Sequence, residues 1–181
     1  MLSPVEAFLR FFSGIKTISL VRDAVSLLLK AALAANLVLW LFWLPVMLRL
    51  HTVPVLLKRL AECKRHKSRK PMELREVIGI ATRVCNLRPF RSRFFPKLCL
   101  RQSLTLYRTL SQMGYPVEIH FGALMDGEDL YGHSWVTMHG EPLADTARSG
   151  IFKVVYSYRY NTLSSGGTEI ERSIEPILNE P

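Results

Sequence analysis

The period of the hydrophobic pattern changes at Gly114, and this change constrains the fold of the 181-residue chain more than any other feature. Residues 98–113 repeat apolar side chains at helical spacing, whereas residues 117–123 alternate apolar with polar or small side chains, which is typical of a strand. Further strands are predicted at 131–138, 141–145 and 151–160. The sequence therefore predicts an α+β fold, in which a run of helices precedes a small antiparallel sheet.

The N-terminal part of the chain is apolar and is predicted to be helical. We expect helix over 3–30, broken in two by Gly14, and again over 55–62 and 72–87. Residues 31–48 contain no charged side chain, and this length is the lower limit for crossing a bilayer. A helix packed on the domain or lying on a membrane surface would have the same composition, so these alternatives stay open.

Charge divides the chain into two halves. Residues 1–100 hold 18 Lys and Arg against 5 Asp and Glu, a net charge of +13, whereas residues 101–181 have a net charge of −4. The basic half could face anionic lipid, nucleic acid or an acidic peptide. We assign residues 1–70 to an apolar, basic helical region that is a candidate for membrane association, 71–160 to the core domain and 161–181 to a flexible acidic tail.

The three cysteines, Cys63, Cys85 and Cys99, are odd in number and widely spaced, which does not indicate a disulfide framework. No signal peptide is evident, and together these features favour a reducing compartment. Cys63 and His66 have a metal-like spacing, but the sequence offers no second pair at zinc distance, so we expect no metal site. The strongly basic residues 63–70 are expected to form an exposed linker.

Cys99 is the candidate nucleophile. It follows Pro96 by about one turn at the start of the predicted helix, where backbone N–H groups and the helix dipole favour a thiolate. Unpaired N–H groups at a helix start can also hold an oxyanion. The alternative is a buried cysteine that packs as a small apolar residue.

His133 is the candidate general base, and Asp145 is the candidate residue that orients its ring. His133, Trp135 and Thr137 point to one side of their strand. If the following loop comprises the three residues 138–140, His133 and Asp145 lie opposite each other, with Cβ atoms about 5 Å apart. A carboxylate there would hold the imidazole in one tautomer while the other nitrogen serves the thiol. The alternative for His133 alone is a hydrogen-bonded strand histidine.

These residues carry a resemblance to a known family. Residues 99–123 and 132–145 are similar to the transglutaminase-like cysteine peptidases of lasso-peptide maturation, the stand-alone leader peptidases related to the C-terminal domain of the microcin-maturation protein. The motif comprises a Cys-Leu at a helix start, a Gly after the helix, a Gly near a strand end, a His-x-Trp-Val strand, a Gly turn and an Asp. In this chain the motif is formed by Cys99-Leu100, Gly114, Gly122, His133-Ser134-Trp135-Val136, Gly140 and Asp145.

The resemblance implies a transglutaminase-like or papain-like core, in which the helix that carries the cysteine packs on a small antiparallel sheet. It implies a cysteine peptidase that removes the leader from a ribosomally synthesised precursor peptide, with Cys99, His133 and Asp145 as catalytic residues. No cofactor is implied. Trp135 is the candidate substrate contact. The alternative role for Trp135 is to pack beside the histidine without contacting substrate. The implied partners are the precursor leader, a separate leader-recognition protein and a macrolactam-forming cyclase.

Two further functions remain open at this point. A transglutaminase-like domain can use the same triad to transfer an acyl group to an amine. A non-catalytic, membrane-associated adaptor would leave Cys99 inert. We expect the protein to be cytoplasmic, and the inner face of the cell membrane is a candidate contact surface. We expect no nucleic acid among its partners.

Overall fold

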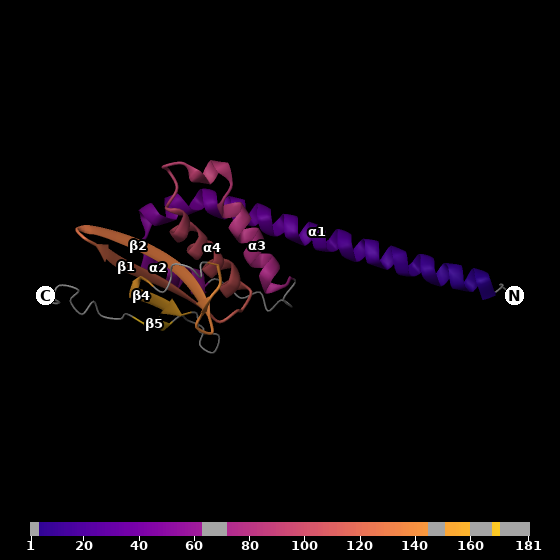
Figure 1. Ribbon diagram of the computed structural model, residues 1–181. Coiled ribbons are helices and arrows are strands. Elements are labelled where there is room, and N and C mark those ends of the chain that lie inside the picture. Colours follow the sequence, from indigo (N-terminus) through magenta and orange to yellow (C-terminus); the bar gives the residue numbers. More distant parts are fainter. Residues whose placement is uncertain (1–3, 63–71, 145–150, 160–167, 171–181) are drawn as a thin grey trace.

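The computed structural model describes residues 4–62, 72–144, 151–159 and 168–170. Helices pack on one face of an antiparallel sheet (Figure 1), so the predicted α+β fold is confirmed. The helices are α1 (Pro4–Leu50), α2 (Val53–Glu62), α3 (Leu74–Cys85), the short 3₁₀ helix η1 (Arg88–Arg91) and α4 (Leu98–Gln112). The predicted basic linker at 63–70 lies outside the described residues.

The first helix, α1, is continuous over 47 residues, so the predicted break at Gly14 is wrong. One glycine costs about 1 kcal/mol inside a helix, which does not end a helix that good helix formers continue on both sides. The N-terminal part of α1 projects away from the rest of the protein (Figure 1). By length and composition Leu20–Leu50 can cross a membrane, with a mean hydropathy of 2.0 in a window that is 17% buried. A soluble core helix or a signal sequence meets the same criteria.

The C-terminal half of α1 packs on the domain through one stripe of side chains. Leu37, Leu41 and Leu44 recur at helical spacing and are fully buried. They belong to one hydrophobic cluster with side chains of α2, α3, α4 and the sheet. An ion pair between Lys30 Nζ and Glu76 Oε1, 2.6 Å long, also connects α1 to α3. The N-terminal region and the core domain therefore share a single core.

The helix α4 covers the sheet, and Gly114 ends it as the sequence predicts. Gly114 has a φ of +80°, a conformation that glycine adopts without strain. The Tyr115 N–H donates to the Leu110 carbonyl, and the Gly114 N–H donates to the Ser111 carbonyl, which is the Schellman pattern of helix termination. Because α4 ends in this compact motif, the chain continues directly into the first strand.

The sheet has the strand order β3-β2-β1-β4-β5, and every neighbouring pair is antiparallel. Val117 and Ile119 on β1 and Val136 on β2 are buried against the helices. Residues 168–170, within the predicted tail, pair with β4, and the rest of 161–181 lies outside the described residues. The strands are β1 (Val117–Asp126), β2 (Asp129–Met138), β3 (Glu141–Pro142), β4 (Lys153–Arg159) and β5 (Thr168–Ile170).

The turn between β2 and β3 comprises two residues, His139 and Gly140, so the predicted three-residue loop at 138–140 is wrong. Both residues have positive φ, 54° for His139 and 86° for Gly140, as in a type I′ turn. Histidine is one of the few residues besides glycine that are enriched in this region, which makes the shorter turn accessible.

The shorter turn moves the register between β2 and β3 by one residue. Thr137 pairs with Pro142, and this register does not place His133 opposite Asp145 as predicted. Asp145 itself lies outside the described residues, so its orienting role stays a prediction.

We predict that α1 contributes to domain stability through its buried stripe alone. Leu41 is fully buried, whereas Leu39 is 64% exposed on the same helix. Because truncation of a buried leucine leaves a cavity, Leu41→Ala should lower the free energy of unfolding by about 2–5 kcal/mol. Leu39→Ala should change it by less than about 0.5 kcal/mol. Urea unfolding followed by circular dichroism measures both values, and equal losses would contradict this packing.

Candidate active site

Cys99 lies in the first turn of α4, where the sequence predicts a nucleophile, and its side chain is half-buried. The N-cap residue, Lys97, makes no side-chain capping bond within the described part of the chain. The first N–H groups of an α-helix have no acceptor inside the helix. The N–H groups at the start of α4 are therefore available to a substrate oxygen next to the thiol.

One open pocket is lined by both Cys99 and His133. It has a volume of about 380 Å³, and most of its wall is apolar. The segment before α4, the start of α4, and strands β1 and β2 form its wall. The lining residues are Pro96, Lys97, Cys99, Leu100, Phe121, Gly122, Gly132, His133 and Ser134. The fold thus places the predicted nucleophile and the predicted base at the same pocket.

The ring of His133 is held between two other rings. It stacks on Phe152 at 4.9 Å between ring centroids and on Trp135 at 5.9 Å. Its Nε2 atom is buried. Ser134 faces α4, and because side chains alternate along a strand, His133 and Trp135 project from the other face of β2. The His133 ring therefore lies on the sheet face opposite to the cysteine helix, although the residue lines the same pocket as Cys99.

Trp135 packs beside His133, which is the role that the sequence offered as the alternative to substrate contact. It is 7% exposed, and its other side stacks on His120 at 5.4 Å between centroids. His120 is fixed in turn by a 2.8 Å hydrogen bond between its Nε2 atom and Thr137 Oγ1. Trp135 as a substrate contact stays a prediction.

Gly122 provides the space that Trp135 occupies. A Cβ atom at Gly122 would lie 2.9 Å from the Trp135 ring and 2.8 Å from the Phe152 Cβ atom, too close for either contact. The glycine that the family motif contains at this position is therefore explained by packing on the histidine side of the sheet.

A second, much smaller cavity adjoins Cys99 on the other side. Its volume of about 20 Å³ is large enough for one water molecule. Its wall is more apolar than polar and is formed by Cys99, Gln102, Ser103, Leu106, Ser134, Trp135, Val136 and Ala144. The thiol is thus bordered by an open apolar pocket and by a small cavity that contains two serine hydroxyls in its wall.

A buried hydrogen bond fixes α4 against β2 beside the site. The Ser103 and Ser134 hydroxyl oxygens are 2.9 Å apart, and both side chains are buried. Ser103 follows Cys99 by about one helical turn, and Ser134 is the neighbour of His133. The bond therefore restricts sliding of the helix along the strand, which would move the thiol relative to the imidazole.

Arg101 is a buried structural residue beside the candidate site that the sequence did not reveal. Its side chain is 3% exposed, and no Asp or Glu of the described residues pairs with it. The guanidinium donates to three backbone carbonyls, those of Cys85 at 2.8 Å, Pro96 at 3.3 Å and Phe90. Burial lowers the pKa of Arg101. The three bonds fasten the end of α3 and the segment before α4 to the start of the cysteine helix.

The sequence does not single out these residues. Arg101 and Arg108 are seven residues apart and lie on one side of the predicted helix 98–113, and only the structure shows that Arg101 is the buried one. Phe152 and His120 gave no signal either, because their contacts with His133 and Trp135 arise from strand pairing. Among the described residues, no group of three His, Cys, Asp or Glu side chains is placed to hold a metal ion.

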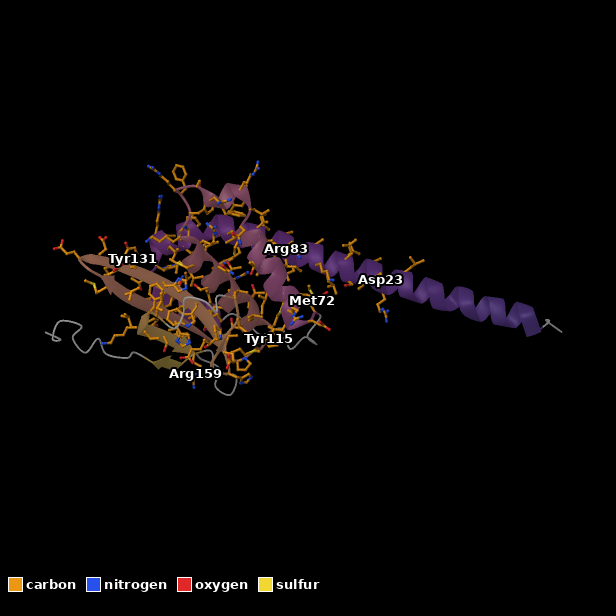
Figure 2. The ribbon with its side chains drawn as sticks, in the orientation of Figure 1. Asp23, Met72, Arg83, Tyr115, Tyr131 and Arg159 are labelled. Carbon is orange, nitrogen blue, oxygen red and sulfur yellow. The ribbon has the colours of Figure 1, made fainter. Side chains whose placement is uncertain are left out.

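We predict that Arg101→Met destabilises the protein and disturbs the site. The substitution leaves buried carbonyls without a donor, so the free energy of unfolding should fall by about 1–3 kcal/mol. Arg83→Met, at an exposed position of α3 (Figure 2), is the matched control and should have little effect. Chemical denaturation measures stability, and alkylation kinetics measure the environment of Cys99. Equal stability of the two variants would contradict a structural role of the guanidinium.

We also predict that Cys99 reacts much faster with iodoacetamide than Cys85 at neutral pH. Cys85 is fully buried, and burial raises the pKa of its thiol, whereas Cys99 opens into the pocket. The difference in rate should exceed about tenfold. Cys63 lies outside the described residues, and we expect it to react more slowly than Cys99 as well. Peptide mass spectrometry after timed quenching gives the three rates, and similar rates would favour an inert Cys99.

A family profile matches most of the chain. The profile of the transglutaminase-like superfamily matches residues 32–157, which extend from α1 through the cysteine helix and β2 into β4. No curated protein and no solved structure gave a significant match. Members of the superfamily are typically cysteine hydrolases. The match covers well over half of the chain and includes Cys99 and His133, and the chain therefore belongs to the transglutaminase-like superfamily.

Proposed function

We propose that the protein is a cysteine peptidase that removes the leader from a ribosomally synthesised precursor during lasso-peptide biosynthesis. The observation that carries the proposal is the pocket that Cys99 and His133 share. Membership of the transglutaminase-like superfamily supports cysteine chemistry. The Cys-Leu and His-x-Trp-Val motifs of residues 99–100 and 133–136 support the narrower assignment to leader removal.

In the proposed reaction His133 takes the thiol proton, and the Cys99 sulfur attacks the scissile carbonyl carbon. The tetrahedral intermediate then collapses, the C–N bond breaks, and His133 returns the proton to the leaving amine of the core peptide. The leader remains bound as a thioester. A water molecule, deprotonated by His133, attacks this thioester and releases the leader as a carboxylate with the thiol restored. Asp145 would orient the imidazole throughout.

Developing negative charge on the carbonyl oxygen needs donors close to the sulfur. The N–H groups at the start of α4 lie next to Cys99, and Lys97 does not occupy them with a side-chain cap. They are aligned by the helix before substrate arrives, so no reorganisation accompanies the reaction. The Arg101 bonds to Pro96 and Phe90 hold the backbone that enters this turn.

The shape of the pocket suits a peptide substrate. It is open and largely apolar, so an extended chain can lie across it with an apolar side chain inside. A separate recognition protein would bind the leader and present the cleavage site, and a cyclase would receive the released core. The small cavity beside Cys99 supports hydrolysis over acyl transfer, because it is large enough for one water molecule next to the thioester and has the Ser103 and Ser134 hydroxyls in its wall.

We predict that Cys99→Ala and His133→Ala each reduce precursor cleavage by at least about 10³-fold without unfolding the protein. Cys85→Ala is the control, since this cysteine is buried outside the pocket. Mass spectrometry of a precursor incubated with the recognition protein measures cleavage, and circular dichroism checks the fold.

Cleavage that persists in Cys99→Ala would contradict the proposal. Reaction in water enriched in heavy oxygen distinguishes hydrolysis from acyl transfer, because hydrolysis adds one heavy oxygen to the leader carboxylate. Transfer of the acyl group to an added amine, with little free leader, would instead identify an acyl transferase.

A further inference from the structure

A second stripe of apolar residues runs along α1 on the side opposite its buried leucines. Its members recur at helical spacing, and between two fifths and two thirds of each side chain is exposed. They are Leu39 (64% exposed), Phe42 (55%), Trp43 (59%), Val46 (41%) and Leu50 (65%). This segment of α1 is therefore apolar on both sides, one side turned to the domain core and the other to the surroundings.

The segment that precedes α4 extends this stripe. The Phe42 ring contacts Phe90 at 5.2 Å and Phe95 at 6.1 Å between centroids, so the segment around η1 lies on α1 (Figure 1). Phe94, between these two contacts in sequence, is 79% exposed. We call the exposed α1 stripe together with Phe94, Arg88, Arg91 and Arg93 the aromatic–basic face.

The cations of this face have no acidic partner within the described ranges. Arg88, Arg91 and Arg93 are exposed and pair with no Asp or Glu of the part that the structure describes. The sequence contains no acidic residue between residues 77 and 117, or between residues 24 and 61. The face therefore combines large apolar side chains with unneutralised positive charge.

The projecting part of α1 is continuous with this face. Figure 2 shows α1 extending past Asp23, away from the other helices. Leu20, Leu27 and Leu28 are 67–69% exposed. Leu20–Leu50 spans about 46 Å at 1.5 Å per residue. Residues 31–48 carry no charge, and the core of the described structure covers only the side of this segment that holds the buried leucines.

We propose that the aromatic–basic face docks the protein on an anionic lipid bilayer. Phe94, Trp43 and the aliphatic stripe of α1 enter the boundary between headgroups and acyl chains, where aromatic side chains are favoured. Arg88, Arg91 and Arg93 contact lipid phosphates. The proposal does not depend on the peptidase function.

An acidic peptide is the other partner that a basic, apolar surface could take. The length of the apolar stripe and its continuation along the projecting helix favour a bilayer, which offers an extended apolar phase. Docking would also bring the catalytic pocket close to the headgroups, because Pro96 and Lys97 line that pocket and directly follow the aromatic–basic face in sequence.

Vesicle sedimentation with the full chain tests the proposal. We expect binding to vesicles that contain phosphatidylglycerol and much weaker binding to phosphatidylcholine alone. The double variant Arg91→Glu/Arg93→Glu should weaken binding at least about tenfold. Phe94→Ser should weaken it as well. The matched controls are Lys153→Glu on β4 and Leu130→Ser at the β1–β2 hairpin, both exposed away from the face, and neither should change binding.

Three results would overturn docking through this face: no vesicle binding, equal binding to both lipids, or binding that neither face variant weakens. If the face variants instead raise the KM for precursor without vesicles and leave vesicle binding intact, the face binds peptide. Cys99→Ala should bind vesicles as the wild type does, so failure of the peptidase assignment and failure of docking are distinguishable.

Discussion

The contact between α4 and β2 is the constraint on which the site depends. Cys99 and His133 belong to different elements, 34 positions apart in the sequence, so the packing of these elements sets their relative position. The buried Ser103–Ser134 hydrogen bond, 2.9 Å long, lies one helical turn from the thiol and one residue from the imidazole. A buried hydroxyl pair is costly to break, because each group loses its hydrogen-bond partner away from bulk solvent.

Arg101 extends this constraint to the segment that leads into the helix. A guanidinium removed from water is stabilised only where polar groups replace its hydration, and here backbone carbonyls do so. The segment held in this way supplies Pro96 and Lys97 to the pocket and exposes Phe94 at the surface. One buried charge therefore supports both the entrance of the candidate active site and the proposed lipid contact.

Local patterns predicted most of the elements around the site. The helical period of residues 98–113, its end at Gly114 and the alternation that follows are properties of neighbouring residues, so the sequence alone reveals them. The shared site of Cys99 and His133 was predicted from the order of Cys99, His133 and Asp145 along these elements and from the family resemblance, not from either residue alone.

What the sequence did not predict depends on tertiary structure or on small energy differences. Gly14 does not break α1, because the cost of one glycine is smaller than the gain from continuing the helix. The turn at His139 is one residue shorter than predicted, because a histidine adopts a positive φ there. The stacking of Phe152 on His133 follows from the pairing of β4 with β1, which brings together residues distant in sequence.

The most direct test is a crystal structure of the protein with a peptide aldehyde that carries the precursor's cleavage sequence. The account predicts a covalent bond from the aldehyde carbon to Cys99 Sγ, with the resulting oxygen hydrogen-bonded to N–H groups at the start of α4. It also predicts a His133 ring nitrogen within hydrogen-bond reach of the sulfur or of that oxygen. An adduct on Cys99 with His133 turned away and another residue in its place would contradict the central claim.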